Sequence, residues 1–341
     1  MRLFDSSEPL CALAPMQDIT GADFMGLIYE IGAPDFFVTE YFRVHETSTF
    51  DAPILQSLNA DFGEVPLCVQ FIGESECHMQ RCIEELKKYP HIRMLDLNLG
   101  CPAPKVYKKN VGGGLLRDLK KAASVIRAMR KAWPYTFSVK TRLGFESPDS
   151  MPEIVKIING EGADFMTLHG RTVRQLYRGS VDYGAIARAV ELSDIPLIAN
   201  GDITSAKFAF DVLKKTGARG AMFGRQAVRN PWIFRQFHEI SAGKKPFEPK
   251  LIDVYNYVQS IYKKHIEKDL NIKYLDGRLK KFLNFIALGV DSDGSFLRQM
   301  RLAQGIDELL EVCKSHLLKN PEKPFADEPF KNLCSRPNHE L

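Results

Sequence analysis

Eight short apolar runs recur through the first two thirds of the chain, and most are separated by segments of helical periodicity. The runs are rich in β-branched or aromatic residues and lie at 10–13, 36–39, 67–71, 94–97, 136–139, 165–168, 196–199 and 220–223. Strands that alternate with helices over roughly 230 residues fit a (β/α)8 barrel of about 250 residues better than an open sheet. The pattern therefore predicts an α/β fold, a (β/α)8 TIM barrel.

A different pattern begins after Trp232, where the alternation stops. Residues 243–249 form a linker, residues 251–262 follow the i, i+3, i+4, i+7 rule, and two further helices are predicted at about 273–288 and 295–317. The segment 321–341 has four prolines and no apolar period, which is typical of irregular structure. We therefore predict a catalytic barrel at 1–242, an all-helical C-terminal domain at 243–320 and an irregular tail at 321–341.

Composition narrows the class of protein. The 341 residues are 45% hydrophobic, and no run approaches the roughly 18 apolar residues that a membrane span needs. The N-terminus lacks the layout of a signal peptide, so we expect a cytoplasmic protein, and we expect it to be a monomer. Seven scattered cysteines without a C-x-x-C pair argue against disulfides, a metal site or an iron–sulfur cluster. A net charge of +4 permits a polyanionic partner without demanding one.

Polar residues follow most of the predicted strands, and on a barrel they face the rim where active sites of this fold lie. Cys101 is the most informative of them. It ends the sequence Asn98-Leu99-Gly100-Cys101, just before a lysine-rich segment that closes with three glycines. A thiol at the barrel mouth, beside the amide of Asn98, is well placed to give or take one proton. The alternative is a small buried hydrophobe, which is the usual fate of a free cysteine.

The loops after the seventh and eighth runs have the composition of a phosphate site. In barrels that bind a phosphorylated cofactor, these two loops commonly hold the phosphate through backbone amides and a cation. Here they contain Asn200-Gly201-Asp202 and Gly224-Arg225. Glycine lets the backbone approach the phosphate, and arginine offers a bidentate charge. The alternative reading is a pair of turn glycines and a surface arginine.

Other strand ends supply groups that suit a planar ring. Lys140 would point a cation into the barrel mouth, unless it forms a structural ion pair. Gln70 and Asn98 are the neutral hydrogen-bonding partners that a heterocycle needs, although an isolated amide more often satisfies neighbouring loop backbone. A phosphate clamp, a cation near a ring and amides along a flat edge together indicate a flavin mononucleotide (FMN) site.

Eight motifs stand in order between about residues 10 and 235: Ala14-Pro15-Met16, Glu40, Val69-Gln70, Asn98-Leu99-Gly100-Cys101-Pro102, Lys140-Thr141-Arg142-Leu143-Gly144, His169-Gly170-Arg171-Thr172, Ala199-Asn200-Gly201-Asp202 and Gly224-Arg225. In this order they resemble the tRNA-dihydrouridine synthases. The helical region is similar to the C-terminal RNA-binding domain of that family. Gln17 departs from the pattern, because a small or acidic residue is frequent there in relatives.

The resemblance implies FMN as the cofactor and NADPH, or NADH, as the reductant. The residues that it assigns to the cofactor are Pro15, Met16 and Gln17 over the isoalloxazine, Gln70 at its pyrimidine edge, Lys140 near N1 and C2=O, His169 along the ring, and Asn200, Gly201, Asp202, Gly224 and Arg225 around the ribityl phosphate. The implied reaction passes a hydride from flavin N5 to C6 of a uracil. Cys101 then protonates C5, Asn98 helps to hold the base, and the product is 5,6-dihydrouridine in tRNA.

A tRNA substrate requires basic contacts, because the stacked uracil must be flipped into the pocket at a cost of roughly a few kcal/mol. The candidates mix cations with an aromatic residue: Lys105, Lys108 and Lys109; Arg171, Arg174, Tyr177 and Arg178; and Lys273, Arg278, Lys280 and Lys281. Together they could follow phosphates around the barrel mouth. The alternative for each is an ordinary solvated surface.

Two other functions are compatible with the same barrel. A flavin-dependent dehydrogenase of a free pyrimidine, similar to dihydroorotate or dihydropyrimidine dehydrogenase, also carries an Asn-x-x-Cys-Pro type of loop. Such an enzyme needs no second domain with a basic face, so the helical region discriminates the two. The third possibility is an RNA-binding or structural barrel that has lost catalysis, and a yellow purified protein would exclude its cofactor-free form.

Overall fold

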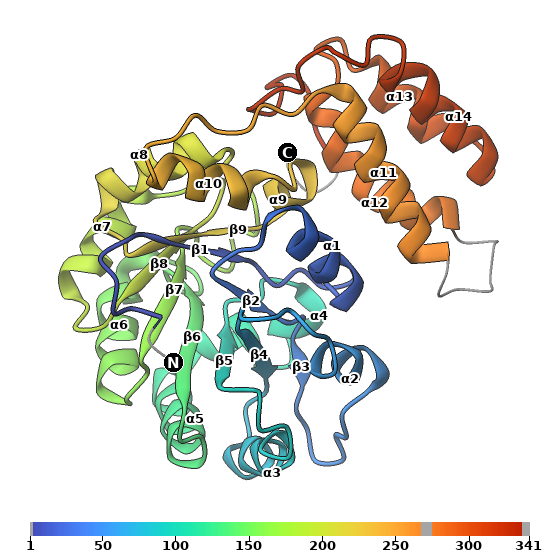
Figure 1. The fold of residues 1–341 in the computed structure, drawn as a ribbon. Coiled ribbons are helices and arrows are strands. Elements are labelled where there is room, and N and C mark those ends of the chain that lie inside the picture. The colour runs from blue at the N-terminus through green and yellow to red at the C-terminus, as the bar shows by residue number, and fades with distance from the viewer. Residues whose placement is uncertain (1–2, 267–274, 336–341) are drawn as a thin grey trace. The chain divides into compact units, whose positions relative to one another are not determined.

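The computed structural model describes residues 3–266 and 275–335. Within them, nine parallel strands form one sheet: β1 (Leu10–Leu13), β2 (Phe36–Val38), β3 (Phe42–Arg43), β4 (Leu67–Ile72), β5 (Met94–Leu99), β6 (Thr136–Arg142), β7 (Phe165–His169), β8 (Leu197–Asn200) and β9 (Gly220–Phe223). Strand β2 pairs with both β1 and β4, so eight strands close into a ring and β3 is an addition on β4 (Figure 1). The predicted (β/α)8 barrel is confirmed.

The strands differ from the predicted runs mainly at their C-terminal ends. Strand β5 continues through Leu99 and β6 continues through Arg142, so Asn98 and Lys140 lie within strands and pair in register. Polar residues can end a strand in a barrel because the rim is open to solvent or ligand. Strand β3 is missing from the prediction because two residues carry no periodicity.

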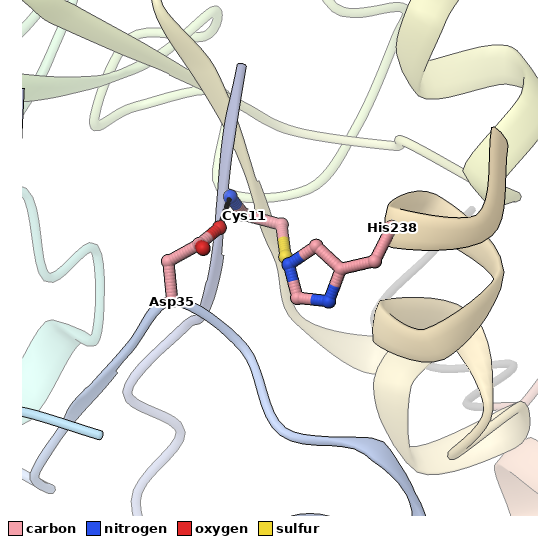
Figure 2. Close-up of side chains that lie close together, drawn as sticks. All are labelled: Cys11, Asp35 and His238. Carbon is pink, nitrogen blue, oxygen red and sulfur yellow. Dashed lines mark hydrogen bonds between the residues drawn. The ribbon is translucent and has the colours of Figure 1, made fainter. Parts of the chain in front are cut away.

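Side chains that alternate along the strands divide the barrel interior into layers. The lower layer is apolar, and its buried members include Ala12, Phe36, Cys68, Met94, Phe165, Ile198 and Met222. On β5, Asp96 and Asn98 follow Met94 at two-residue intervals and therefore share its side of the strand. Below the rim, the loop before β2 is tied to β1, because Asp35 Oδ2 accepts a hydrogen bond from the Cys11 backbone N–H at 2.7 Å (Figure 2).

The strands and the helices that surround them form one compact unit, Met1–Ala22, Pro34–Ile203 and Phe208–Phe223. Its helical segments are α2 (Ala52–Leu58), α3 (Glu76–Leu86), α4 (Pro104–Tyr107), η1 (Gly112–Arg117), α5 (Leu119–Ala132), η2 (Pro148–Ser150), α6 (Met151–Gly160), α7 (Tyr183–Leu192) and α8 (Ala206–Thr216). Aspartates begin several of them. Asp118 caps α5 by accepting from the Lys121 N–H, and Asp182 caps α7 by accepting from the Ala185 N–H.

A second compact unit comprises Asp23–Ala33, Thr204–Lys207 and Gly224–Leu341. Its helical segments are α1 (Ala22–Gly32), α9 (Arg225–Arg229), α10 (Ile233–Ser241), α11 (Leu251–Ile266), α12 (Leu275–Ile286), η4 (Ala287–Gly289), α13 (Ser295–Leu302) and α14 (Gly305–Leu317). Helix α1 joins this unit through an ion pair between Glu30 and Lys264 at 2.8 Å. The predicted domain boundaries at 242 and 320 cut the chain into consecutive segments, whereas each compact unit combines several separate segments. These boundaries stay a prediction.

The single helix predicted at 295–317 is wrong, because α13 and α14 are separate. Gly305 has a φ of +77°, a left-handed backbone conformation that interrupts the helix. Lys280 Nζ donates to the Ala303 carbonyl at 2.6 Å and so satisfies an oxygen that the break leaves without a helical partner. Lys273, which the sequence placed on a basic helix, lies outside the described residues.

The described part of the tail, 321–335, contains neither helix nor strand, but it is tied down. Pro324 forms a β-bridge with Lys250, and Phe325 is buried. The buried Arg229 donates to the carbonyls of Ala326, at 2.6 Å, and Asp327. None of the helices in the described residues has the length and apolar character to cross a bilayer.

Candidate active site

Cys101 lies in the loop that follows β5, at the C-terminal end of the barrel. Its side chain is half-buried and packs against the apolar cluster of Ile72, Val106 and Val111. Burial raises the pKa of the thiol, and a backbone hydrogen bond from Ala103 together with nearby cations opposes the rise. The thiol therefore holds its proton at neutral pH, which is the state that a proton donor needs.

Asn98 holds the backbone on which Cys101 sits. Its Oδ1 accepts from the Gly100 N–H at 3.1 Å and from the Cys101 N–H at 2.9 Å. Its Nδ2 donates to Gln70 Oε1 at 2.7 Å. Gln70 is 0% exposed and Asn98 is buried above it, so both predicted amides lie in one network beside the thiol.

Three consecutive glycines pack against the Cys101 loop, where there is no space for larger side chains. A Cβ on Gly112, which has a φ of +57°, would lie 3.2 Å from Cys101 Cβ, and one on Gly114 would lie 2.4 Å from the Tyr107 carbonyl oxygen. The Gly113 N–H also donates to the Cys101 carbonyl at 3.2 Å. The segment therefore has one compact conformation that larger residues would not permit.

Lys140, His169 and Asn200 meet at the ends of β6, β7 and β8. Asn200 Nδ2 donates to the Met222 carbonyl at 2.8 Å, which leaves Oδ1 as the acceptor for His169 Nδ1 at 2.9 Å and Lys140 Nζ at 3.3 Å. His169 therefore carries its proton on Nδ1. The pKa of His169 lies well below its ordinary value, mainly because the ring is buried, so the ring is neutral at physiological pH.

The Lys140 ammonium lies beside Asn200, and the charge of Asp96 also acts on it. Among the described residues no acidic group lies within ion-pair distance of its ammonium, so the rival interpretation as an ion pair is not supported. Burial, and then Arg142, lower its pKa to about 8. A cation held in this way fits an anionic group at the rim.

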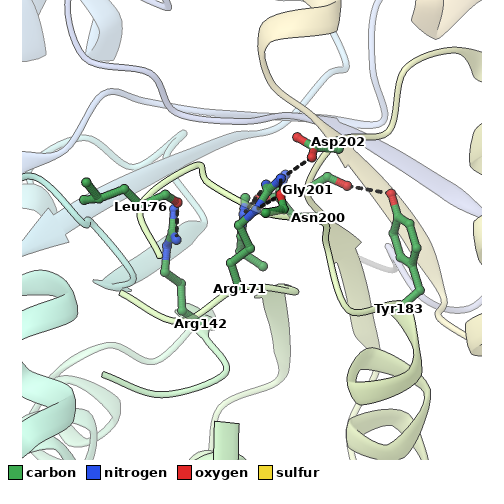
Figure 3. Close-up of polar contacts among 9 residues, drawn as sticks. Arg142, Arg171, Leu176, Tyr183, Asn200, Gly201 and Asp202 are labelled. Carbon is green, nitrogen blue, oxygen red and sulfur yellow. Dashed lines mark hydrogen bonds and ion pairs between the residues drawn. The ribbon is translucent and has the colours of Figure 1, made fainter. Parts of the chain in front are cut away.

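Polar contacts join Arg171 to the Asn200–Asp202 turn (Figure 3). Arg171 is 2% exposed, forms an ion pair with Asp202 and donates to the Gly179 carbonyl. Gly201 has a φ of +116°, and a Cβ there would lie 2.9 Å from Val181 Cγ2. Tyr183, which sequence reasoning missed, donates its hydroxyl to the Gly201 carbonyl at 2.8 Å.

Arg142 orders the loop that follows β7. The buried guanidinium donates to the carbonyls of Thr172, at 2.8 Å, and Leu176, at 2.7 Å (Figure 3). It also lies 5.5 Å from the ring centroid of Tyr177. Tyr177 is 42% exposed, and the neighbouring Arg178 is exposed as well. The structure therefore presents these two predicted RNA contacts on an ordered loop, whereas Arg171 is enclosed.

The loop of Pro15, Met16 and Gln17 is shaped by Glu40, which sequence reasoning noted only as part of a motif. Glu40 accepts from the backbone N–H groups of Asp18, at 2.9 Å, and Ile19, at 3.0 Å. Burial raises the pKa of this carboxyl, and those N–H groups oppose the rise. A carboxylate thus holds the turn that follows β1, in which Asp18 has a φ of +63°.

Five further predicted residues lie in the second compact unit. Gly224 is the N-cap of α9 and Arg225 is its first residue, directly after β9 in the chain. On α12, Arg278 and Lys281 are exposed. Lys280 is half-buried, and its ammonium is engaged by the Ala303 carbonyl.

Comparisons with known proteins point in one direction. A model of the family described as "Dihydrouridine synthase (Dus)" matches residues 12–321. A "Probable tRNA-dihydrouridine synthase" of Helicobacter pylori is 35% identical over 227 residues, 66% of this chain and 68% of that protein. "tRNA-dihydrouridine synthase B" of Proteus vulgaris is 31% identical over 312 residues, 89% of this chain and 94% of that protein.

Among solved structures, a mutant morphinone reductase in complex with tetrahydroNAD is similar in fold, with a TM-score of 0.51 and 12% identity. The match covers 71% of this chain and 90% of that one. With a family model that spans most of the chain and relatives above 30% identity, the chain belongs to the dihydrouridine synthase family.

Proposed function

We propose that this protein reduces a uridine of tRNA to 5,6-dihydrouridine, with FMN as cofactor and NADPH or NADH as reductant. It acts as a cytoplasmic monomer without a metal ion. The observation that carries the proposal is a protonated, half-buried thiol, Cys101, at the same end of the barrel as the cation Lys140 and the neutral His169. Family membership supports the substrate, because the relatives named above are tRNA-dihydrouridine synthases.

The residues at the rim fit a flavin. Lys140 is a cation without a carboxylate partner among the described residues, so it suits the N1 and C2=O edge, where negative charge develops on reduction. Gly201 offers a backbone without a side chain of its own, at a position where a Cβ would lie 2.9 Å from Val181 Cγ2. We assign Asn200, Gly201, Asp202, Gly224 and Arg225 to the ribityl phosphate, and Pro15, Met16, Gln17, Gln70 and His169 to the ring.

Cys101 is the proposed acid. When bound, the flavin supplies a hydride from N5 to C6 of the uracil after its own reduction by NADPH or NADH. The Cys101 thiol gives its proton to C5, and the raised pKa keeps that proton on sulfur until the base arrives. Asn98 orients the thiol loop through its two backbone contacts.

The exposed cations and Tyr177 are proposed to hold the tRNA. Tyr177 and Arg178 offer a stacking surface and a phosphate contact on the ordered loop after β7. Lys105, Lys108 and Lys109, exposed in the segment after Cys101, and Arg278 and Lys281 on α12 add positive charge.

The test uses tRNA from a strain that lacks this gene, incubated with the purified protein, FMN and NADPH. We expect mass spectrometry to detect dihydrouridine at defined positions, and free uracil or dihydroorotate to give no turnover. Turnover of a free pyrimidine with no modified tRNA would replace the proposal with the dehydrogenase alternative. A colourless protein that does not bind FMN would exclude both enzymes.

A further inference from the structure

We propose that Asp96 is a positioning residue for Cys101, acting through Gln70 and Asn98. This inference rests on the proposed function, because it assigns a role in presenting the proton donor. Asp96 belongs to none of the motifs at the strand ends, and it lies one layer deeper in the barrel than Asn98, on the same side of β5.

A continuous chain of hydrogen bonds links Asp96 to the thiol loop. Ser138 Oγ donates to Asp96 Oδ1 at 2.6 Å, and Gln70 Nε2 donates to Asp96 Oδ2 at 2.8 Å. Asn98 Nδ2 donates to Gln70 Oε1 at 2.7 Å, and the Cys101 N–H donates to Asn98 Oδ1 at 2.9 Å. The members come from β4, β5 and β6, and the side chains of the first four are buried.

The carboxylate of Asp96 fixes the direction of these hydrogen bonds, that is, which amide group donates and which accepts. A side-chain amide can turn over and exchange its donor and its acceptor, so an amide network needs a fixed end. Above pH 7 the ionised form of Asp96 predominates and only accepts, which forces the Gln70 NH2 group toward Asp96 and its oxygen toward Asn98. Asn98 must then turn its own oxygen toward the Gly100 and Cys101 N–H groups.

Burial leaves the network no alternative partner in water. Asp96 is 3% exposed, and burial raises its pKa to about 7, against the hydrogen bonds from Ser138 and Gln70 and the charge of Lys140. Loss of the carboxylate would leave the Gln70 NH2 group buried without its acceptor. Gln70 and Asn98 could then reverse together, and an NH2 group would face the backbone N–H groups of the thiol loop.

The decisive variant is Asp96→Leu, which keeps the branching and the number of heavy atoms of the side chain and has no acceptor. Asp96→Asn is its partner, because an asparagine can still accept from Gln70 while donating to the Ser138 hydroxyl. In single turnover with reduced flavin and tRNA, we expect uridine reduction to fall by roughly 10- to 100-fold in the leucine variant. Less than a fivefold fall is expected for asparagine. Because the flavin is reduced before mixing, neither rate depends on flavin reduction by NADPH.

A second readout requires neither flavin nor tRNA. The alkylation rates of Cys101 and the exposed Cys77 by iodoacetamide are compared by peptide mass spectrometry. We expect the ratio of the Cys101 rate to the Cys77 rate to rise at least threefold in Asp96→Leu, because the thiol loop loses its anchor. The double variant Asp96→Leu/Gln70→Leu should match Gln70→Leu alone if Asp96 acts through Gln70.

The control is Thr216→Val on α8, which removes a buried hydroxyl that donates to the Val212 carbonyl. It should lower stability without changing the rate of uridine reduction or the alkylation ratio. If Asp96→Leu leaves both readouts at the wild-type value, or changes them no more than Thr216→Val does, the inference is overturned. A wild-type protein that forms no dihydrouridine would instead refute the proposed function, and the alkylation ratio would still judge the role of Asp96.

Discussion

Replacing Lys140 with methionine is expected to stabilise the flavin-free protein at neutral pH while impairing its function. The ammonium makes one hydrogen bond, to Asn200 Oδ1, and burial followed by the charge of Arg142 lowers its pKa to about 8. A lysine whose pKa falls on folding opposes folding at every pH where the folded state must hold it charged. Methionine is unbranched like lysine and one atom shorter, and it removes that opposition.

The magnitude follows from linkage. The folded pKa of about 8 lies about 2.5 below the ordinary value of 10.5, and at about 1.4 kcal/mol per pH unit the charged form is disfavoured by at most about 3.5 kcal/mol. Partial exposure of the side chain and loss of the hydrogen bond to Asn200 reduce the net gain to about 2 kcal/mol at pH 7.

The sign of the pH dependence is also determined. Below pH 8 the lysine is protonated in both states, so the advantage of methionine is complete. Between pH 8 and 10.5 the unfolded chain keeps a proton that the folded chain releases, so the wild-type protein gains stability with rising pH and the advantage shrinks. Above that range both states are neutral, and little of the advantage remains.

Urea denaturation of the flavin-free proteins at pH 7 and pH 10.5 measures both effects. Lys140→Arg is the matched control, because its charge persists across this range and it should show no gain at pH 7. Retention of FMN should fall in the methionine variant and less in the arginine variant. A methionine variant that is no more stable than wild type at pH 7, or whose gain is equal at pH 10.5, refutes the reasoning.

Three other substitutions test the remaining parts of the site. Cys101→Ala should keep its flavin and its reduction by NADPH but lose about 10²- to 10⁴-fold in uridine reduction, and an unchanged rate would reject the proton-donor role. Gly201→Ala should destabilise the protein by roughly 1–3 kcal/mol and weaken FMN retention, measured by denaturation and flavin titration, because the φ of +116° and the contact with Val181 both resist a Cβ. Arg278→Gln with Lys281→Gln should raise KM for tRNA and flatten its salt dependence, while flavin reduction stays the same. If tRNA binding is unaffected by that pair, α12 has another role.

Local patterns in the sequence were sufficient to predict the barrel and to predict which residues lie at its rim. Apolar runs of strand length and segments of helical period depend on neighbouring residues, so the eight strands of the ring and helices such as α5 could be located before any contact was known. Cys101, Lys140, His169 and Asn200 were placed at one rim by a general rule, since parallel strands of a barrel end on the same side. That rule needs no knowledge of side-chain contacts.

The tertiary structure alone decided what those side chains do. Asp96 looked like any polar residue in an apolar run, and only the pairing of β4, β5 and β6 brings it to Gln70 and Ser138. Arg171 and Lys280 were predicted as RNA contacts from their charge. In the structure Arg171 is buried and paired with Asp202, and Lys280 donates to the Ala303 carbonyl. Hydrogen-bond partners and desolvation depend on residues far apart in the chain, and a local pattern carries no record of them.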